Sequence, residues 1–131
     1  MLYFFYMSWF NKKTKGNLDF VAIGDIVTDA FIELNDAWIE TDNPEKSKEL
    51  CMRFGDKIPY EKVDVIPAVG NSPNAAVSAH RLGLKSALVT NFGDDKYGQE
   101  KMEQLKKESL DTQFVTVHKD TGSNYHFVLR F

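Results

Sequence analysis

The chain has 131 residues, 43% of them hydrophobic and 27% charged, and its formal net charge at pH 7 is −3. This length predicts one domain that buries roughly two thirds of its unfolded surface, and the composition is that of an ordinary globular protein. The acidic balance and the scattered basic residues argue against binding to nucleic acid or to an anionic membrane. The single cysteine, Cys51, excludes an internal disulfide, so we expect a reducing, cytoplasmic environment.

The first ten residues, MLYFFYMSWF, are apolar and aromatic. They are too few to span a bilayer, and they lack the basic start and small-residue cleavage site of a secretory signal. The polar stretch 11–17 is typical of a linker. We therefore expect residues 1–18 to be an apolar and basic extension outside the fold. A true start at Met7 explains the apolar segment most simply, and an anchor or docking segment is the alternative.

Two strands are predicted before the first loop. Residues 19–24 are a short apolar run that ends in glycine, which is typical of a buried strand in a parallel sheet. Residues 27–34 continue in an extended conformation after a turn. The polar stretch 35–47, with Asn43-Pro44 as a breaker, predicts a loop.

A β-hairpin is expected after this loop. Residues 50–54 alternate apolar and polar side chains, which is the periodicity of a strand. Gly55-Asp56 is a two-residue hairpin signal, so residues 57–65 are expected to return as the partner strand.

The first helix has start and stop signals. Ser72 can cap a helix whose first position is Pro73, because proline there leaves no N–H group unsatisfied. The helix is expected to run to about Leu82, where Gly83 supplies the C-terminal stop. Residues 86–90 are apolar enough for a second buried strand.

Residues 96–109 predict an amphipathic helix with Met102 and Leu105 facing the core. Its charged residues are expected to face solvent: Glu100, Lys101, Glu103, Lys106 and Lys107. Strands are predicted over 112–117 and 123–131, joined by a turn. The whole order predicts an α/β layered domain with an attached β element.

Two features can serve a ligand, but the residues alone leave the question open. The loop from Val69 to Asn74 leads into a helix and presents unpaired N–H groups that can bind an anion or a hydroxyl. It does not match the P-loop or the dinucleotide fingerprint. From the residues alone, the interpretation as a plain helix cap is favoured over a ligand-binding loop. Asp25 and Asp29 follow a strand, where ligand-binding carboxylates occur in α/β folds, yet aspartate is also a common turn residue.

Three motifs together resemble the PfkB (ribokinase-like) carbohydrate kinases, in that family's order and spacing. They are GDIVTD at 24–29, GNSPNAA at 70–76 and NFGDDKYG at 91–98. The resemblance covers roughly residues 19–131. It implies the N-terminal part of a ribokinase-like three-layer α/β/α domain with a small β-sheet lid, whose elements are expected at about 30–66 and 112–131.

The resemblance also implies which residues bind the sugar. Asp29 corresponds to the aspartate that accepts hydrogen bonds from sugar hydroxyls, and Asn74 to the asparagine that contacts the sugar. Gly70 lets the backbone approach the ligand, and Asn71 is the polar residue that follows it. The sequence departs from the family at Val69, which stands where the first glycine of the pair is usual.

No catalytic residue and no metal ligand is expected in this chain. Gly93, Asp95 and Gly98 of the third motif are interpreted as turn and helix-start residues, and the three histidines, which have no metal-site spacing, as structural. The family's catalytic segment, Asp-Thr-x-Gly-Ala-Gly-Asp, does not occur in the sequence. Because phosphoryl transfer depends on positioning and charge stabilisation, we expect the chain to be inactive alone.

The resemblance implies an intact enzyme that transfers the γ-phosphate of ATP to a sugar hydroxyl with Mg²⁺. Neither ATP nor Mg²⁺ is expected to bind this chain tightly, and the expected partner is a small-molecule sugar. The alternatives are a fragment of a nucleoside kinase and a short, non-catalytic protein that binds a sugar or a partner. In the family such lids often pair between subunits, so a homodimer through the β lid is a further expectation.

Overall fold

The computed structural model describes residues 17–41 and 48–131. The predictions made for residues 1–16 therefore lie outside the described residues. The secondary-structure elements in chain order are β1 (Phe20–Ile23), β2 (Val27–Leu34), β3 (Trp38–Glu40), β4 (Glu49–Cys51), β5 (Tyr60–Val69), α2 (Asn71–Arg81), β6 (Ser86–Gly93), α3 (Lys96–Lys107), β7 (Val115–His118) and β8 (Tyr125–Arg130).

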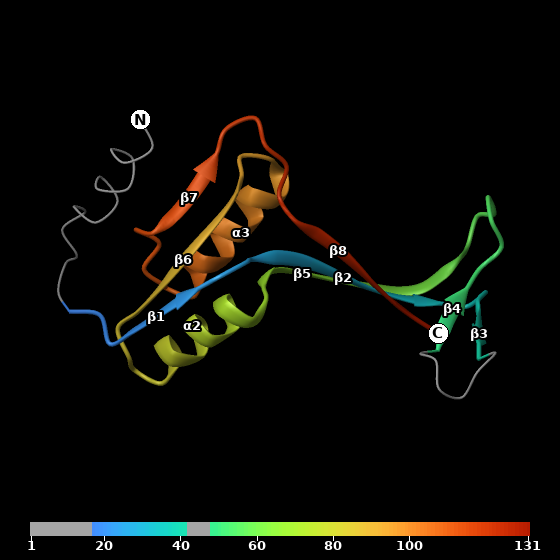
Figure 1. The fold of residues 1–131 in the computed structure, drawn as a ribbon, viewed down its shortest axis with the longest axis horizontal. Helices are drawn as coiled ribbons and strands as arrows, with labels where there is room; N and C mark the ends of the chain where they lie inside the picture. Colours follow the sequence, from blue (N-terminus) through green and yellow to red (C-terminus); the bar gives the residue numbers. More distant parts are fainter. Residues whose placement is uncertain (1–16, 42–47) are drawn as a thin grey trace.

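The main sheet is parallel, in the order β1-β6-β7. Helices α2 and α3 pack against one of its faces, where Ala22 and Leu88 meet Ala76 and Leu105 in a single buried cluster. This packing removes apolar surface from water, the largest stabilising contribution to a domain of this size. Figure 1 shows this layered part at one end of the molecule and a long β arm leading away from it. The predicted α/β class with an attached β element is confirmed.

The arm is a second sheet in the order β5-β2-β8; it contains strands from the segments expected to form the lid, and we call it the lid. Strand β2 pairs antiparallel with β5 and parallel with β8. Of the segment 112–131, β8 pairs with β2 in this sheet, whereas β7 pairs with β6 in the main sheet.

The two faces of the lid differ in chemistry. Directly paired residues of neighbouring strands point to the same side of a sheet, so the pairing shows which residues share a face. Ala30 of β2 lies between Val65 and Phe127, which makes one face apolar. The other face is charged, and its pairs include Glu33 with Lys62 and with Arg130.

The predicted hairpin around Gly55-Asp56 is wrong in its pairing. Strand β4 pairs antiparallel with β3, so that Ile39 lies opposite Leu50, and β5 pairs with β2 instead. The alternation of residues 50–54 identified a strand but not its partner. Strands β2 and β5 offer each other a long matched ladder, whereas β4 has only three residues.

The predicted start of the first helix is also wrong. Gly70 is the N-cap residue of α2, and no side chain of the described residues caps the helix. Ser72 lies inside the first turn, and its hydroxyl donates a hydrogen bond to the carbonyl oxygen of Ile23 at 2.9 Å. The predicted stop is confirmed, since Gly83 has a φ of 93° just beyond the helix, a conformation that favours glycine.

The helix predicted at 96–109 is confirmed, with Leu105 buried and Met102 packed against the core. Lys101, predicted to face solvent, is fully buried instead. Its ammonium donates a hydrogen bond to the backbone oxygen of Asn124 at 3.0 Å. The loop before β8 thus reaches this side of α3, a contact that helical periodicity alone does not predict. No helix in the described part of the chain is long and apolar enough to cross a membrane.

Two glycines make a close approach of three segments possible. A Cβ atom at Gly93 would lie 1.8 Å from the backbone oxygen of Thr121, and one at Gly98 would lie 1.9 Å from the oxygen of Gly93. Contacts this short require the backbone to move. These glycines therefore let the turn after β6, the start of α3 and the loop before β8 pack directly on one another.

We predict that Gly93→Ala lowers the free energy of unfolding by about 3 kcal/mol, because the added methyl group meets backbone atoms. The matched control is Gly122→Ala, where an added Cβ meets nothing within 4 Å and the change should be less than about 1 kcal/mol. Urea unfolding of both variants measures the difference. Equal stability of the two variants would contradict the prediction.

Candidate functional site

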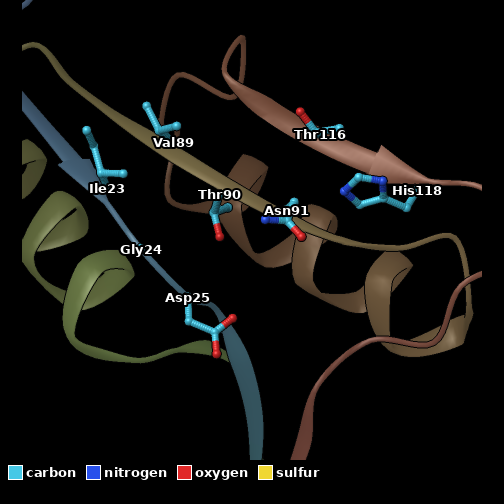
Figure 2. A pocket seen from close by; sticks show the side chains of 8 residues that line it. All are labelled: Ile23, Gly24, Asp25, Val89, Thr90, Asn91, Thr116 and His118. Atoms are coloured by element: carbon cyan, nitrogen blue, oxygen red, sulfur yellow. The ribbon is translucent and has the colours of Figure 1, made fainter. Parts of the chain in front are cut away.

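The carboxyl ends of β1, β6 and β7 lie at one edge of the parallel sheet, where ligands bind in open α/β folds. A pocket of about 360 Å³ opens at this edge. Figure 2 shows its lining, with the hydroxyl of Thr90 directed to the side on which Asp25 lies. The lining residues are Ile23, Gly24, Asp25, Val89, Thr90, Asn91, Thr116 and His118.

The first and second motifs meet beside this pocket. A Cβ atom at Gly24 would lie 2.3 Å from the hydroxyl oxygen of Ser72, and one at Gly70 would lie 3.1 Å from the carbonyl oxygen of Asp25. Both glycines have positive φ, 156° and 130°. The absence of a side chain at both positions therefore lets the turn after β1 and the N-terminus of α2 approach each other closely.

The carboxylate of Asp25 is held in place by hydrogen bonds at the rim of the pocket. Its Oδ1 accepts from the backbone N–H of Ile26 at 3.0 Å. The Nδ2 group of Asn124 donates to both carboxylate oxygens, at 3.1 and 3.0 Å. Hydrogen bonds to an ionised carboxylate are stronger than those between neutral groups, so the side chain has a defined orientation toward the pocket.

The third motif ties the β6–α3 turn to the loop before β8. Asp95 is the N-cap residue of α3 and accepts from the N–H of Gly98 at 2.8 Å. It also accepts from the hydroxyl and the N–H of Ser123, at 2.6 and 3.0 Å. The hydrogen bonds from Ser123 are the main cause that lowers the pKa of Asp95 below its ordinary value of 3.8. These contacts agree with the structural role predicted for Asp95.

The four residues predicted to bind the sugar do not line one pocket. Gly70 lies against Asp25, as described above, and Asn71 is exposed at the start of α2. Asn74 lines a second pocket of about 240 Å³ between β5, α2 and α3. Asp29 lies on the lid strand β2, with its Oδ1 3.6 Å from Nδ1 of His126 on β8. The residues thus lie around the junction of the main sheet and the lid.

Three residues of the site were missed from the sequence. Thr90 lines the pocket, is 4% exposed, and its hydroxyl has no hydrogen-bond partner among the described residues. Lys101 donates a hydrogen bond to the backbone oxygen of Asn124, and the side chain of Asn124 donates to Asp25. The run Thr121-Gly122-Ser123-Asn124 carries turn residues, which was the available signal, but nothing local shows that this turn lies beside the end of β1.

Two histidines interpreted as structural lie close to these groups. His118 lines the pocket of Figure 2, and His126 lies beside Asp29. Within residues 17–41 and 48–131 no group of three or more metal-binding side chains comes together.

Comparison with known proteins gives the family. Residues 45–130 match the pfkB family carbohydrate kinase, which is more than half of the chain. The chain therefore belongs to the pfkB family of carbohydrate kinases, and the resemblance seen in its motifs is confirmed.

Relatives match over part of their length. The chain is 37% identical over 60 residues to a protein of Pyrococcus horikoshii named as a sugar kinase, which covers 45% of this chain and 19% of that protein. It is 35% identical over 54 residues to mouse ribokinase, covering 41% of this chain and 17% of that protein.

Solved structures confirm the ribokinase-like fold. The crystal structure of the same Pyrococcus horikoshii protein in complex with ATP has a TM-score of 0.58 at 24% identity, over 84% of this chain and 30% of that one. A nucleoside kinase of Burkholderia thailandensis in complex with inosine has a TM-score of 0.62 at 15% identity, over 84% and 31%. This chain thus spans about a third of the solved kinases that it resembles.

We predict a pH-dependent effect of Asp95→Asn. The pKa of Asp95 is lower in the folded state than in the unfolded state, so the charge stabilises the fold above about pH 4. This contribution is lost as the pH falls through the folded-state pKa. Asp95→Asn should therefore lower the urea midpoint at pH 7 and lose this effect toward pH 3.

The matched control for this prediction is Asp94→Asn at the neighbouring, exposed position. It should leave the urea midpoint nearly unchanged across the same pH range. A difference between Asp95→Asn and the unmodified chain that stays constant from pH 7 to pH 3 would contradict the proposed role of the charge.

Proposed function

We propose that this chain is the N-terminal, sugar-binding portion of a carbohydrate kinase that transfers the γ-phosphate of ATP to a sugar hydroxyl. The observation that supports this most is the convergence of the three motifs at the junction of the main sheet and the lid. Membership of the family and the pocket at the strand ends support the same conclusion. We place the protein in the cytoplasm, in line with its single cysteine.

In this proposal the carboxylate of Asp29 accepts hydrogen bonds from sugar hydroxyls, and the amide of Asn74 offers both a donor and an acceptor. Gly70 brings the backbone close to the ligand, and Asn71 follows it at the helix N-terminus. The lid carries Asp29 on β2, so its closing over the sugar would exclude water from the site.

The donor half of the reaction, with ATP and Mg²⁺, is proposed to lie outside this chain. The printed sequence has no glycine-rich segment of the catalytic type, and its described residues bring no carboxylate cluster together. We therefore expect this chain to bind a sugar without transferring phosphate. Formation of a sugar phosphate from ATP by the purified 131-residue chain would contradict this expectation.

A nucleoside is the second candidate acceptor. The likeness to a nucleoside kinase solved with inosine supports it at the level of the fold, and the extended lid offers room for a larger ligand. Titration of the chain with D-ribose, D-fructose and inosine separates a sugar from a nucleoside. A chain that binds a sugar and functions without any kinase partner would instead fit the non-catalytic alternative.

We predict that Asp29→Ala weakens sugar binding by at least about 1 kcal/mol, because a hydrogen bond to a charged group is lost. The control is Asp64→Ala, which removes another carboxylate of the lid, on β5. Isothermal titration calorimetry or NMR titration with the sugar that the unmodified chain prefers measures both. Equal affinities of the two variants would remove Asp29 from the site.

A homodimer through the lid is also proposed. The apolar face of the lid has large exposed side chains, including Phe127 at 67% and Val65 at 48%. An exposed apolar patch of this kind marks an interaction surface, and a second copy of the chain offers the same patch. Burial of these side chains against each other would shield both.

We predict that Phe127→Lys converts this dimer to a monomer, because it places a charge in the proposed interface. The control is Lys62→Ala on the charged face of the lid, which should leave the dimer intact. Light scattering after size-exclusion chromatography gives the mass of each variant. A monomeric unmodified chain would contradict the proposed dimer.

A further inference from the structure

The carboxylate of Asp25 retains capacity to bind a ligand. An ionised carboxylate has about four acceptor positions, and the hydrogen bonds that Asp25 accepts within the described residues come from only two groups, the N–H of Ile26 and the amide of Asn124. The pocket that Asp25 lines is also lined by Asn91, Thr116 and His118, whose polar side chains offer further hydrogen-bonding groups to a ligand.

The position of Asp25 depends on Asn124, and that of Asn124 on a buried cation. The backbone oxygen of Asn124 accepts from the N–H of Thr28 at 3.2 Å and from the ammonium of Lys101 at 3.0 Å. Its side chain then donates to Asp25. Lys101, Asn124 and Asp25 therefore form a continuous chain of contacts from the interior of α3 to the rim of the pocket.

A buried lysine at this position has a cost. Lys101 is fully buried, and this burial lowers its pKa, although Asp95, Glu100 and Asp25 act in the opposite direction. Taking an ammonium group out of water costs free energy that hydrogen bonds and opposite charges repay only in part. A gain in stability therefore does not explain why a lysine occupies this buried position. A role in orienting Asn124 does explain it.

We propose that Asp25 is a ligand-contacting residue of the pocket, accepting a hydrogen bond from a hydroxyl group of the bound sugar or nucleoside. Lys101 is its positioning residue and acts through Asn124. This inference deepens the proposed function and rests on it, because the ligand is the same acceptor. It adds the rim of the pocket at the strand ends to the residues Asp29, Gly70 and Asn74 around the lid.

The test uses the full 131-residue chain labelled with ¹⁵N and titrated with D-ribose, D-fructose and inosine. Asp25→Asn should weaken binding of the preferred compound about tenfold, as expected for a hydrogen bond to a charged group. Lys101→Met should weaken it severalfold without lowering the urea midpoint. The control is Lys106→Met on the exposed side of the same helix, which should change neither quantity.

Two readouts separate positioning from a general structural effect. In the absence of ligand, the side-chain amide protons of Asn124 should exchange slowly in the unmodified chain and faster in Lys101→Met. In an Asn124→Ala background, Lys101→Met should have no further effect on affinity, because the link to Asp25 is already broken. Unchanged exchange of the Asn124 amide in Lys101→Met, or additive losses of affinity, would overturn the proposal.

The outcomes also distinguish this inference from the proposed function. If the unmodified chain binds none of the three compounds, the ligand-contacting role of Asp25 fails together with the proposed function. The exchange of the Asn124 amide still decides whether Lys101 positions it. If Lys101→Met does not fold, the ammonium resonance of Lys101 in the unmodified chain replaces it as the readout. Slow exchange of the ammonium protons supports the buried contact, and fast exchange overturns it.

Discussion

The hydrogen bonds between Ser123 and Asp95 are the contacts on which the arrangement of this molecule depends. They fasten the loop before β8 to the turn between β6 and α3. Asn124 comes next in the chain, so the same contacts place it beside the end of β1. From there β8 enters the lid alongside β2. One carboxylate thus fixes the point at which the main sheet and the lid meet, and the glycines around it allow the segments to approach.

Features set by local periodicity could be predicted from the sequence. The apolar runs of β1 and β6 and the amphipathic pattern of α3 were recognised, because strand and helix periods act on neighbouring residues. Three predictions failed where a distant segment decided the outcome. The partner of β4 was set by the longer ladder available to β5, Ser72 bonds to the end of β1, and Lys101 bonds to Asn124 in the loop before β8.

In the candidate site, too, the features set by local sequence could be predicted and those set by distant segments could not. The motifs identified Gly70 and the turn containing Asp25, because glycine and aspartate at these spacings are visible in the sequence. The contributions of Thr90 and Asn124 were not visible, since they depend on which strand ends meet in space. A threonine in an apolar strand has the sequence pattern of a core residue, and only the structure shows that Thr90 lies at the end of β6 that borders the pocket.

The connection between Asp25 and Asn124 has a consequence for how the protein folds. The two residues are 99 positions apart, so nearly the whole chain must be present before this contact can form. Strand β2 can pair with β5 early, because the loop between them is short compared with the path to β8. Closing the larger loop costs more entropy and slows folding. During synthesis, β2 must therefore wait with one edge unpaired until β8 leaves the ribosome.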